Sequence, residues 1–108
     1  MGSTGAVTRI SNSVVSQAVQ LVRPFTHAVV DMDNKEITIP FDKGITQDDV
    51  MQPGMLGAWF KDNGFSISFT KGDYEYTTKD KWRNARGWNV EKGHRAVLRD
   101  RLIGKVRW

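Results

Sequence analysis

Residues 65–78 read FSISFTKGDYEYTT, and this stretch carries the clearest structural signal in the chain. Phe and Ile alternate with Ser over 65–69, and Tyr alternates with Glu and Thr over 74–77. Alternation of apolar and polar residues indicates strands with one buried face. Lys71-Gly72-Asp73, between the two runs, has the composition of a turn. The stretch therefore predicts a β-hairpin over 65–78.

A second hairpin is predicted upstream, over residues 26–41. Two apolar runs, 26–32 and 36–41, flank the turn-forming residues Asp33-Asn34-Lys35. Pro40 has no backbone N–H and cannot donate to a strand ladder. The strand that contains Pro40 should therefore lie at an edge of the sheet or turn that side toward solvent, and we predict the edge position.

A helix is predicted over residues 12–23. Apolar residues recur there at intervals of three and four, Ser11 or Asn12 precedes them as a cap, and Pro24 follows where a helix should stop. Many of these apolar residues are valines, which favour strands because branching at Cβ restricts the side chain in a helix. A strand is the alternative for this segment.

Residues 46–64 indicate helical structure interrupted by Pro53-Gly54. Thr46 and Asp49 form the pattern of a capping box, and an apolar stripe continues as far as Asn63-Gly64. Because Pro is best tolerated in the first turn of a helix, we expect a short helix over 47–51 and a main helix from Pro53 to Asp62.

A final helix is predicted over residues 90–103. Asn89 precedes it as a cap, and Val90, Val97 and Leu98 share one face with Leu102. With the two hairpins, these helices predict an α+β fold in which two β-hairpins (26–41 and 65–78) pack against two or three helices (12–23, 53–62 and 90–103). The length of 108 residues predicts a single domain over 1–108, with residues 1–10 as a flexible arm.

The chain has no cysteine, which excludes disulfides and thiolate zinc sites and is compatible with a reducing cytoplasm. The N-terminus lacks the pattern of a signal peptide, and no apolar run approaches the ~20 residues of a membrane helix. We expect a cytoplasmic protein that is neither secreted nor membrane-bound, with a place in a virion as a further option.

The net charge of +4 is unevenly distributed along the chain. Residues 1–78 contain six Lys and Arg against nine Asp and Glu, a net charge of −3. Residues 79–108 contain ten Lys and Arg against three Asp and Glu, a net charge of +7. Such polarisation attracts polyanions to one end of a molecule.

Residues suited to catalysis are sparse. His27 and His94 stand alone, outside any metal-binding spacing, and the ten glycines form no phosphate-binding loop. Asp31 and Asp33, near Glu36, are of the type that holds a divalent cation, but acidic residues beside a turn usually bond their own backbone. The sequence therefore predicts no enzymatic activity, no metal site and no cofactor.

The basic C-terminal segment predicts nucleic-acid binding, to DNA or RNA. On the predicted final helix Lys92, Arg95 and Arg99 follow one another at intervals of three and four residues, which places them in a row along which phosphates can bind. Tryptophans among cations can stack on unpaired bases. The predicted contact residues are Lys81, Trp82, Arg83, Arg86, Trp88, Lys92, Arg95 and Arg99. The alternative for the tryptophans is a place in the core.

A non-enzymatic protein–protein interaction or assembly module is the alternative function, as a viral structural component or an inhibitor that docks on an acidic partner surface. An edge strand ending at Phe41 and the terminal Lys105-Val106-Arg107-Trp108 motivate it. Polarised charge also allows a homo-oligomer.

Overall fold

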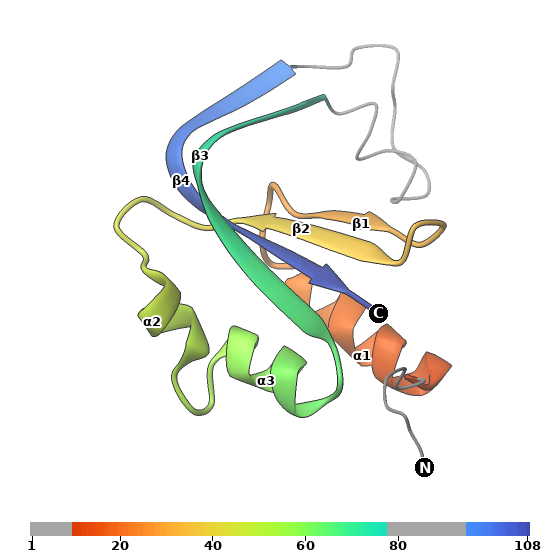
Figure 1. Ribbon diagram of the computed structural model, residues 1–108. Coiled ribbons are helices and arrows are strands. Elements are labelled where there is room, and N and C mark those ends of the chain that lie inside the picture. Colours follow the sequence, from red (N-terminus) through yellow and green to blue (C-terminus); the bar gives the residue numbers. More distant parts are fainter. Residues whose placement is uncertain (1–9, 78–94) are drawn as a thin grey trace.

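The computed structural model describes residues 10–77 and 95–108, which form one antiparallel sheet with helices on one of its faces (Figure 1). The strand order in this part of the chain is β1-β2-β4-β3. The α+β class predicted from the sequence is confirmed. The elements in chain order are α1 (Asn12–Val22), β1 (Val29–Asp31), β2 (Glu36–Pro40), α2 (Gln47–Met51), α3 (Leu56–Asp62), β3 (Ser66–Thr77) and β4 (Arg95–Arg107).

Helix α1 confirms the prediction for residues 12–23, and the strand alternative is wrong. The Ser11 side chain accepts a hydrogen bond from the Val14 N–H at 3.3 Å, which caps the first turn. Val15, Ala18 and Val22 are buried, so burial follows the helical period and outweighs the strand preference of valine. Residues 1–9 of the predicted arm lie outside the described residues. Ile10 packs against the core.

Strands β1 and β2 form the predicted first hairpin, with Val29 paired to Thr38 and Asp31 to Glu36. The Asp31 carboxylate accepts hydrogen bonds from the backbone N–H and the side-chain amide of Asn34, at 3.1 and 2.8 Å. Lys35 takes a left-handed conformation with φ 54°. Asp31 therefore stabilises the turn, as its place in the sequence indicates.

The prediction that the Pro40 strand lies at an edge is wrong, because β2 lies between β1 and β4. The Phe41 N–H donates to the Leu102 carbonyl of β4 at 2.8 Å. Since successive N–H groups of a strand point to opposite sides, the nitrogen of Pro40 faces the β1 side. Strand β1 begins only at Val29, opposite Thr38, so no β1 residue pairs with Pro40 and an internal strand accommodates it without losing a bond.

Helix α2 begins with the predicted capping box between Thr46 and Asp49, with bonds of 3.0 and 3.2 Å. Helix α3 begins at Leu56, three residues later than expected from Pro53. The reason is Gly54, whose φ of 85° is incompatible with a right-handed helix. Pro53 and Gly54 therefore form the turn between two short helices.

The predictions of a hairpin over 65–78 and a helix over 90–103 are both wrong. Residues 66–77 form the single strand β3, which pairs with β4 from Ser66 opposite Arg107 to Thr77 opposite Arg95. Residues 90–94 of the predicted helix lie outside the described residues, and the rest of it is in β4. The two segments that carry the ladder are distant in sequence, and their pairing overrides the local turn and helix signals.

Lys71-Gly72-Asp73, the expected turn, is the site of a β-bulge. Gly72 lies opposite Arg101 and Tyr74 lies opposite Leu98. The single residue Asp73 of β3 is therefore opposite two residues of β4, Arg99 and Asp100. The extra residue, Asp100, has φ 58°, and its N–H donates to Asp73 Oδ1 at 2.9 Å. Beyond the bulge the two strands curve toward the side of the sheet opposite the helices (Figure 1).

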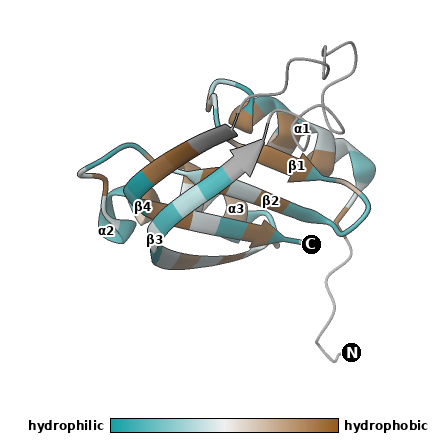
Figure 2. Cartoon of the chain, turned by 90° about the horizontal axis from the view of Figure 1, so that it is seen from above, coloured by the Kyte–Doolittle hydropathy of each residue, from teal (hydrophilic) through white to brown (hydrophobic). Residues whose placement is uncertain are grey.

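The main core lies between the helices and the sheet, where brown apolar segments alternate with polar ones along the strands (Figure 2). Phe60 of α3 and Ile37 and Ile39 of β2 are fully buried there. On the opposite face Thr38 and Ile103 are each only 8% exposed. The middle of the sheet is therefore covered on both faces. The buried apolar cluster comprises Ala18, Val22, Ile37, Ile39, Phe41, Val50, Phe60, Phe65, Leu102 and Val106.

Candidate nucleic-acid interface

The predicted contact residues fall in two places. Two of them, Arg95 and Arg99, belong to β4. The other predicted contacts lie outside the described residues, in the segment that joins β3 to β4, and they are Lys81, Trp82, Arg83, Arg86, Trp88 and Lys92.

The prediction that Arg95 and Arg99 lie on one face of a final helix is wrong. Arg95 and Arg99 belong to a strand, where residues four apart are separated by about 13 Å, against about 6 Å along a helix. Arg99 Nη1 lies 3.4 Å from Asp73 Oδ2, at the bulge. Arg99 therefore faces a carboxylate of its own chain.

Three other described cations around β4 also have acidic neighbours. Glu36 accepts a hydrogen bond from Arg107 Nε at 2.7 Å and lies 3.6 Å from Lys105 Nζ. Lys71 Nζ lies 3.8 Å from Asp100 Oδ1. Most of these side chains are largely exposed, so each pair adds about 0–1 kcal/mol at most. Their main effect is to reduce the positive field around β4.

The net charge differs between the described residues and the segment that joins β3 to β4. Residues 10–77 and 95–108 together hold ten Lys and Arg and ten Asp and Glu, a net charge of zero. Residues 78–94 hold five Lys and Arg against two Asp and Glu, a net charge of +3. Of the +7 on residues 79–108, the segment between the two long strands therefore holds +3, and residues 95–108 hold +4, which carboxylates elsewhere in the described body offset.

Two of the three carboxylates weighed as cation ligands, Asp31 and Glu36, have structural partners instead. Asp31 bonds to Asn34 in the turn, and Glu36 pairs with Arg107. Among residues 10–77 and 95–108, no group of three His, Asp or Glu side chains is arranged to hold a metal ion. Hydrogen bonds from the Thr46 backbone and hydroxyl hold the pKa of Asp49 below its ordinary value, which suits an acidic residue in the first turn of a helix.

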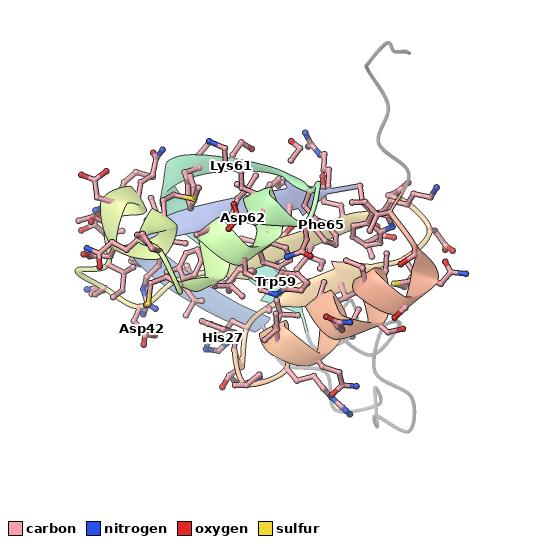
Figure 3. All side chains as sticks on the ribbon, turned by 90° about the horizontal axis from the view of Figure 1, so that it is seen from below. His27, Asp42, Trp59, Lys61, Asp62 and Phe65 are labelled. Atoms are coloured by element: carbon pink, nitrogen blue, oxygen red, sulfur yellow. The ribbon has the colours of Figure 1, made fainter. Side chains whose placement is uncertain are left out.

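A surface that sequence reasoning missed lies where α1 ends. His27 and Asp42, which lie at the same end of the molecule (Figure 3), line a polar pocket of about 330 Å³ with Phe25 and Pro40. A second, apolar pocket of about 190 Å³ shares Phe25 and Asp42 and extends to Met55. The two pockets bring together residues from loops, from β2 and from the two short helices, so no local pattern indicates them.

The terminal residues raised as an interface anchor are engaged within the chain. The Trp108 ring packs edge-on against Phe65, with centroids 6.0 Å apart, and the backbone N–H of Trp108 donates to the Lys35 carbonyl at 3.2 Å. Trp108 therefore closes the edge of the core. An anchoring role would require it to leave these contacts.

No helix in the described part of the chain has the length and apolar character needed to cross a membrane. The chain matches no protein-family model, no curated protein and no solved structure.

Proposed function

We propose that this protein binds nucleic acid through the basic, tryptophan-containing segment between β3 and β4, residues 79–92. The observation that carries the proposal is the distribution of charge: the described body is neutral, and residues 78–94 hold a net charge of +3. Trp82 and Trp88 lie among these cations in the sequence. A phosphate backbone is attracted by the cations, and an unpaired base can stack on an indole ring.

The fold supports this proposal by the way it holds the ends of the segment. The β3–β4 ladder continues as far as the pair of Thr77 with Arg95, so both ends are attached to neighbouring strands. Binding segments are commonly presented in this way by a rigid scaffold. The role proposed is binding without catalysis or a cofactor, and the absence of cysteine fits a cytoplasmic setting.

The test is the affinity of the full chain for labelled single-stranded DNA, duplex DNA and single-stranded RNA over a range of salt concentrations, measured by fluorescence anisotropy. Residues 78–94 contain five Lys and Arg. If all of them contact phosphates, the logarithm of the binding constant should fall against that of salt with a slope of about −3.5 for single strands and −4.5 for duplexes. Binding that does not respond to salt would refute the proposal.

Variants of equal charge locate the interface. Replacing Lys81, Arg83 and Arg86 together by Ala should weaken binding and reduce the slope by about two to three. The matched control replaces three cations of the body, Arg23, Lys35 and Lys43, and should leave both quantities nearly unchanged. Equal losses in both triple variants would show that only total charge matters.

The tryptophans test stacking separately from charge. Trp82→Ala and Trp88→Ala should each weaken single-strand binding by about 1–3 kcal/mol if the ring stacks on a base, with the salt slope unchanged. Loss of folding, followed by circular dichroism, would instead place the affected ring in the core.

An acidic protein surface is the competing partner for the same cations. Poly-glutamate, added as a competitor at equal salt and equal charge concentration, distinguishes the two. If unlabelled nucleic acid displaces the labelled strand at a much lower concentration than poly-glutamate does, the proposal is supported. Tighter binding of poly-glutamate would replace nucleic acid with an acidic protein as the partner.

A further inference from the structure

The two edges of the sheet differ in how they resist pairing with another chain. Strand β1 is short, ends at Asp31 and is followed by Met32-Asp33. Strand β3 is long, and its first part, Ser66–Thr70, contains no charged residue and no Pro. Short length, charge and Pro are the usual protections of an edge strand. Among the described residues, β1 is therefore protected against pairing with another chain, whereas the start of β3 is not.

No described element covers the outer side of β3. In Figure 1 this strand lies at the front, and in Figure 2, seen from above, it again forms the near edge. Ser66, Ser68 and Thr70 are exposed on one face, while Ile67 and Phe69 are half-buried on the helix-facing side. Within residues 10–77 and 95–108, this edge has no pairing strand for its backbone groups, and the apolar side chains beside them are incompletely covered.

We propose that two copies of this chain pair antiparallel through residues Ser66–Thr70 of β3, about a two-fold axis at Ser68. The two sheets then become one continuous sheet with the helices of both copies on the same side. In this register Ile67 lies opposite Phe69 of the second copy, and Ser66 lies opposite its Thr70. The bulge at Gly72 bends β3 away beyond this stretch and limits the pairing to it.

Self-complementarity identifies a second copy as the partner. On the helix-facing side apolar residues meet apolar residues, and on the other side hydroxyl groups meet hydroxyl groups, both of which stabilise antiparallel pairs. A shift of one residue would turn apolar side chains toward the polar face. A shift of the axis to Phe69 would place Ile67 opposite Lys71. The axis at Ser68 avoids both mismatches.

Charges next to this edge are also compatible with a two-fold axis. Helix α3 packs against β3, and Figure 3 shows its Lys61 beside that strand. The neighbouring Asp62 is likewise exposed and has the opposite charge. Each copy therefore brings one charge of each sign to this side of the sheet, so the proposed contact does not bring together two surfaces of like net charge.

The self-paired position, Ser68, gives the sharpest test. Sedimentation equilibrium of the nuclease-treated full chain should give twice the mass of one chain. Ser68→Lys and Ser68→Glu should each raise the dimer dissociation constant by about tenfold or more, because like charges then lie directly opposite. Mixing the two variants should restore the dimer. Ser16→Lys, at an exposed serine of α1, is the control and should not change the mass.

Cross-linking tests the register. The chain has no cysteine, so Ser68→Cys introduces a single thiol at the axis. Under oxidising conditions it should form a covalent dimer readily, whereas Ser16→Cys should not. A wild-type chain of monomeric mass at all concentrations, a dimer unaffected by Ser68→Lys, or equal cross-linking of both cysteine variants would overturn the proposal. None of these measurements involves nucleic acid, so they are independent of the proposed function.

Discussion

Gly57 in α3 offers a direct test of how closely the two short helices pack. A Cβ atom placed on Gly57 would lie 2.5 Å from Met51 Sδ, 2.8 Å from Val50 Cγ1 and 2.8 Å from the Val50 carbonyl oxygen. The Met51 side chain is flexible and can move. Val50 is only 4% exposed and its carbonyl belongs to the backbone, so α3 itself would have to shift.

Two opposing effects decide the sign of Gly57→Ala. Alanine is favoured over glycine within a helix by about 1 kcal/mol. Overpacking of a well-packed site costs about 1–3 kcal/mol. The balance predicts that Gly57→Ala lowers the free energy of unfolding by up to about 2 kcal/mol, the opposite of the usual effect of this substitution.

The assay is urea denaturation followed by tryptophan fluorescence, to which Trp59 of α3 contributes. The difference between Lys61→Ala and Lys61→Gly, at an exposed position of the same helix, measures local helix preference without the steric conflict. Met51→Ala combined with Gly57→Ala should be less destabilising than the sum of the single effects, because it removes the nearest obstacle. A Gly57→Ala variant more stable than wild type by about 1 kcal/mol would refute the close approach.

Three other predictions concern the bulge, the capping box and the core. Asp100→Gly should preserve or raise the melting temperature and Asp100→Val should lower it, because φ is 58° there and the exposed pair with Lys71 adds little; a more stable Val variant would contradict the left-handed conformation. Since the pKa of Asp49 is lowered in the folded state, its contribution to stability is present at neutral pH and is lost as the pH falls through the folded pKa. Asp49→Asn should therefore reduce the loss of stability between pH 7 and acid pH, measured by urea midpoints, and an unchanged pH profile would exclude this role. Phe60→Ala, which empties a fully buried site, should cost about 3–5 kcal/mol of unfolding free energy, and a loss below about 1 kcal/mol would place the ring outside the core.

Local signals in the sequence determined the first half of the molecule. Ser11, the spacing of buried residues and Pro24 define α1, and Thr46 with Asp49 defines the start of α2. The first hairpin follows from its turn residues, where Asp31 bonds to Asn34. Each of these features depends on contacts within a few residues, so a short sequence window contains their cause.

The second half was decided by pairing between distant segments. Lys71-Gly72-Asp73 has the composition of a turn, yet Asp73 accepts its hydrogen bond from Asp100, far along the chain. In β4, Ile103 is buried on one face of the sheet while Leu102 and Val106 are buried on the other. Burial on both faces in this part of β4, together with the extra residue at the bulge, removes the simple alternation of a strand, which is why its apolar residues gave a helical pattern.

The candidate site divides in the same way. Composition alone located the basic segment with Trp82 and Trp88, because charge is a property of the residues themselves. Only the tertiary structure showed that Glu36, Asp73 and Asp100 offset the cations around β4, and that β3 forms an open edge. Whether a cation has an acidic neighbour, and whether a strand lies at an edge, depends on which segments become neighbours in the fold. Pairing between distant strands decides this, and here it outweighs local preferences.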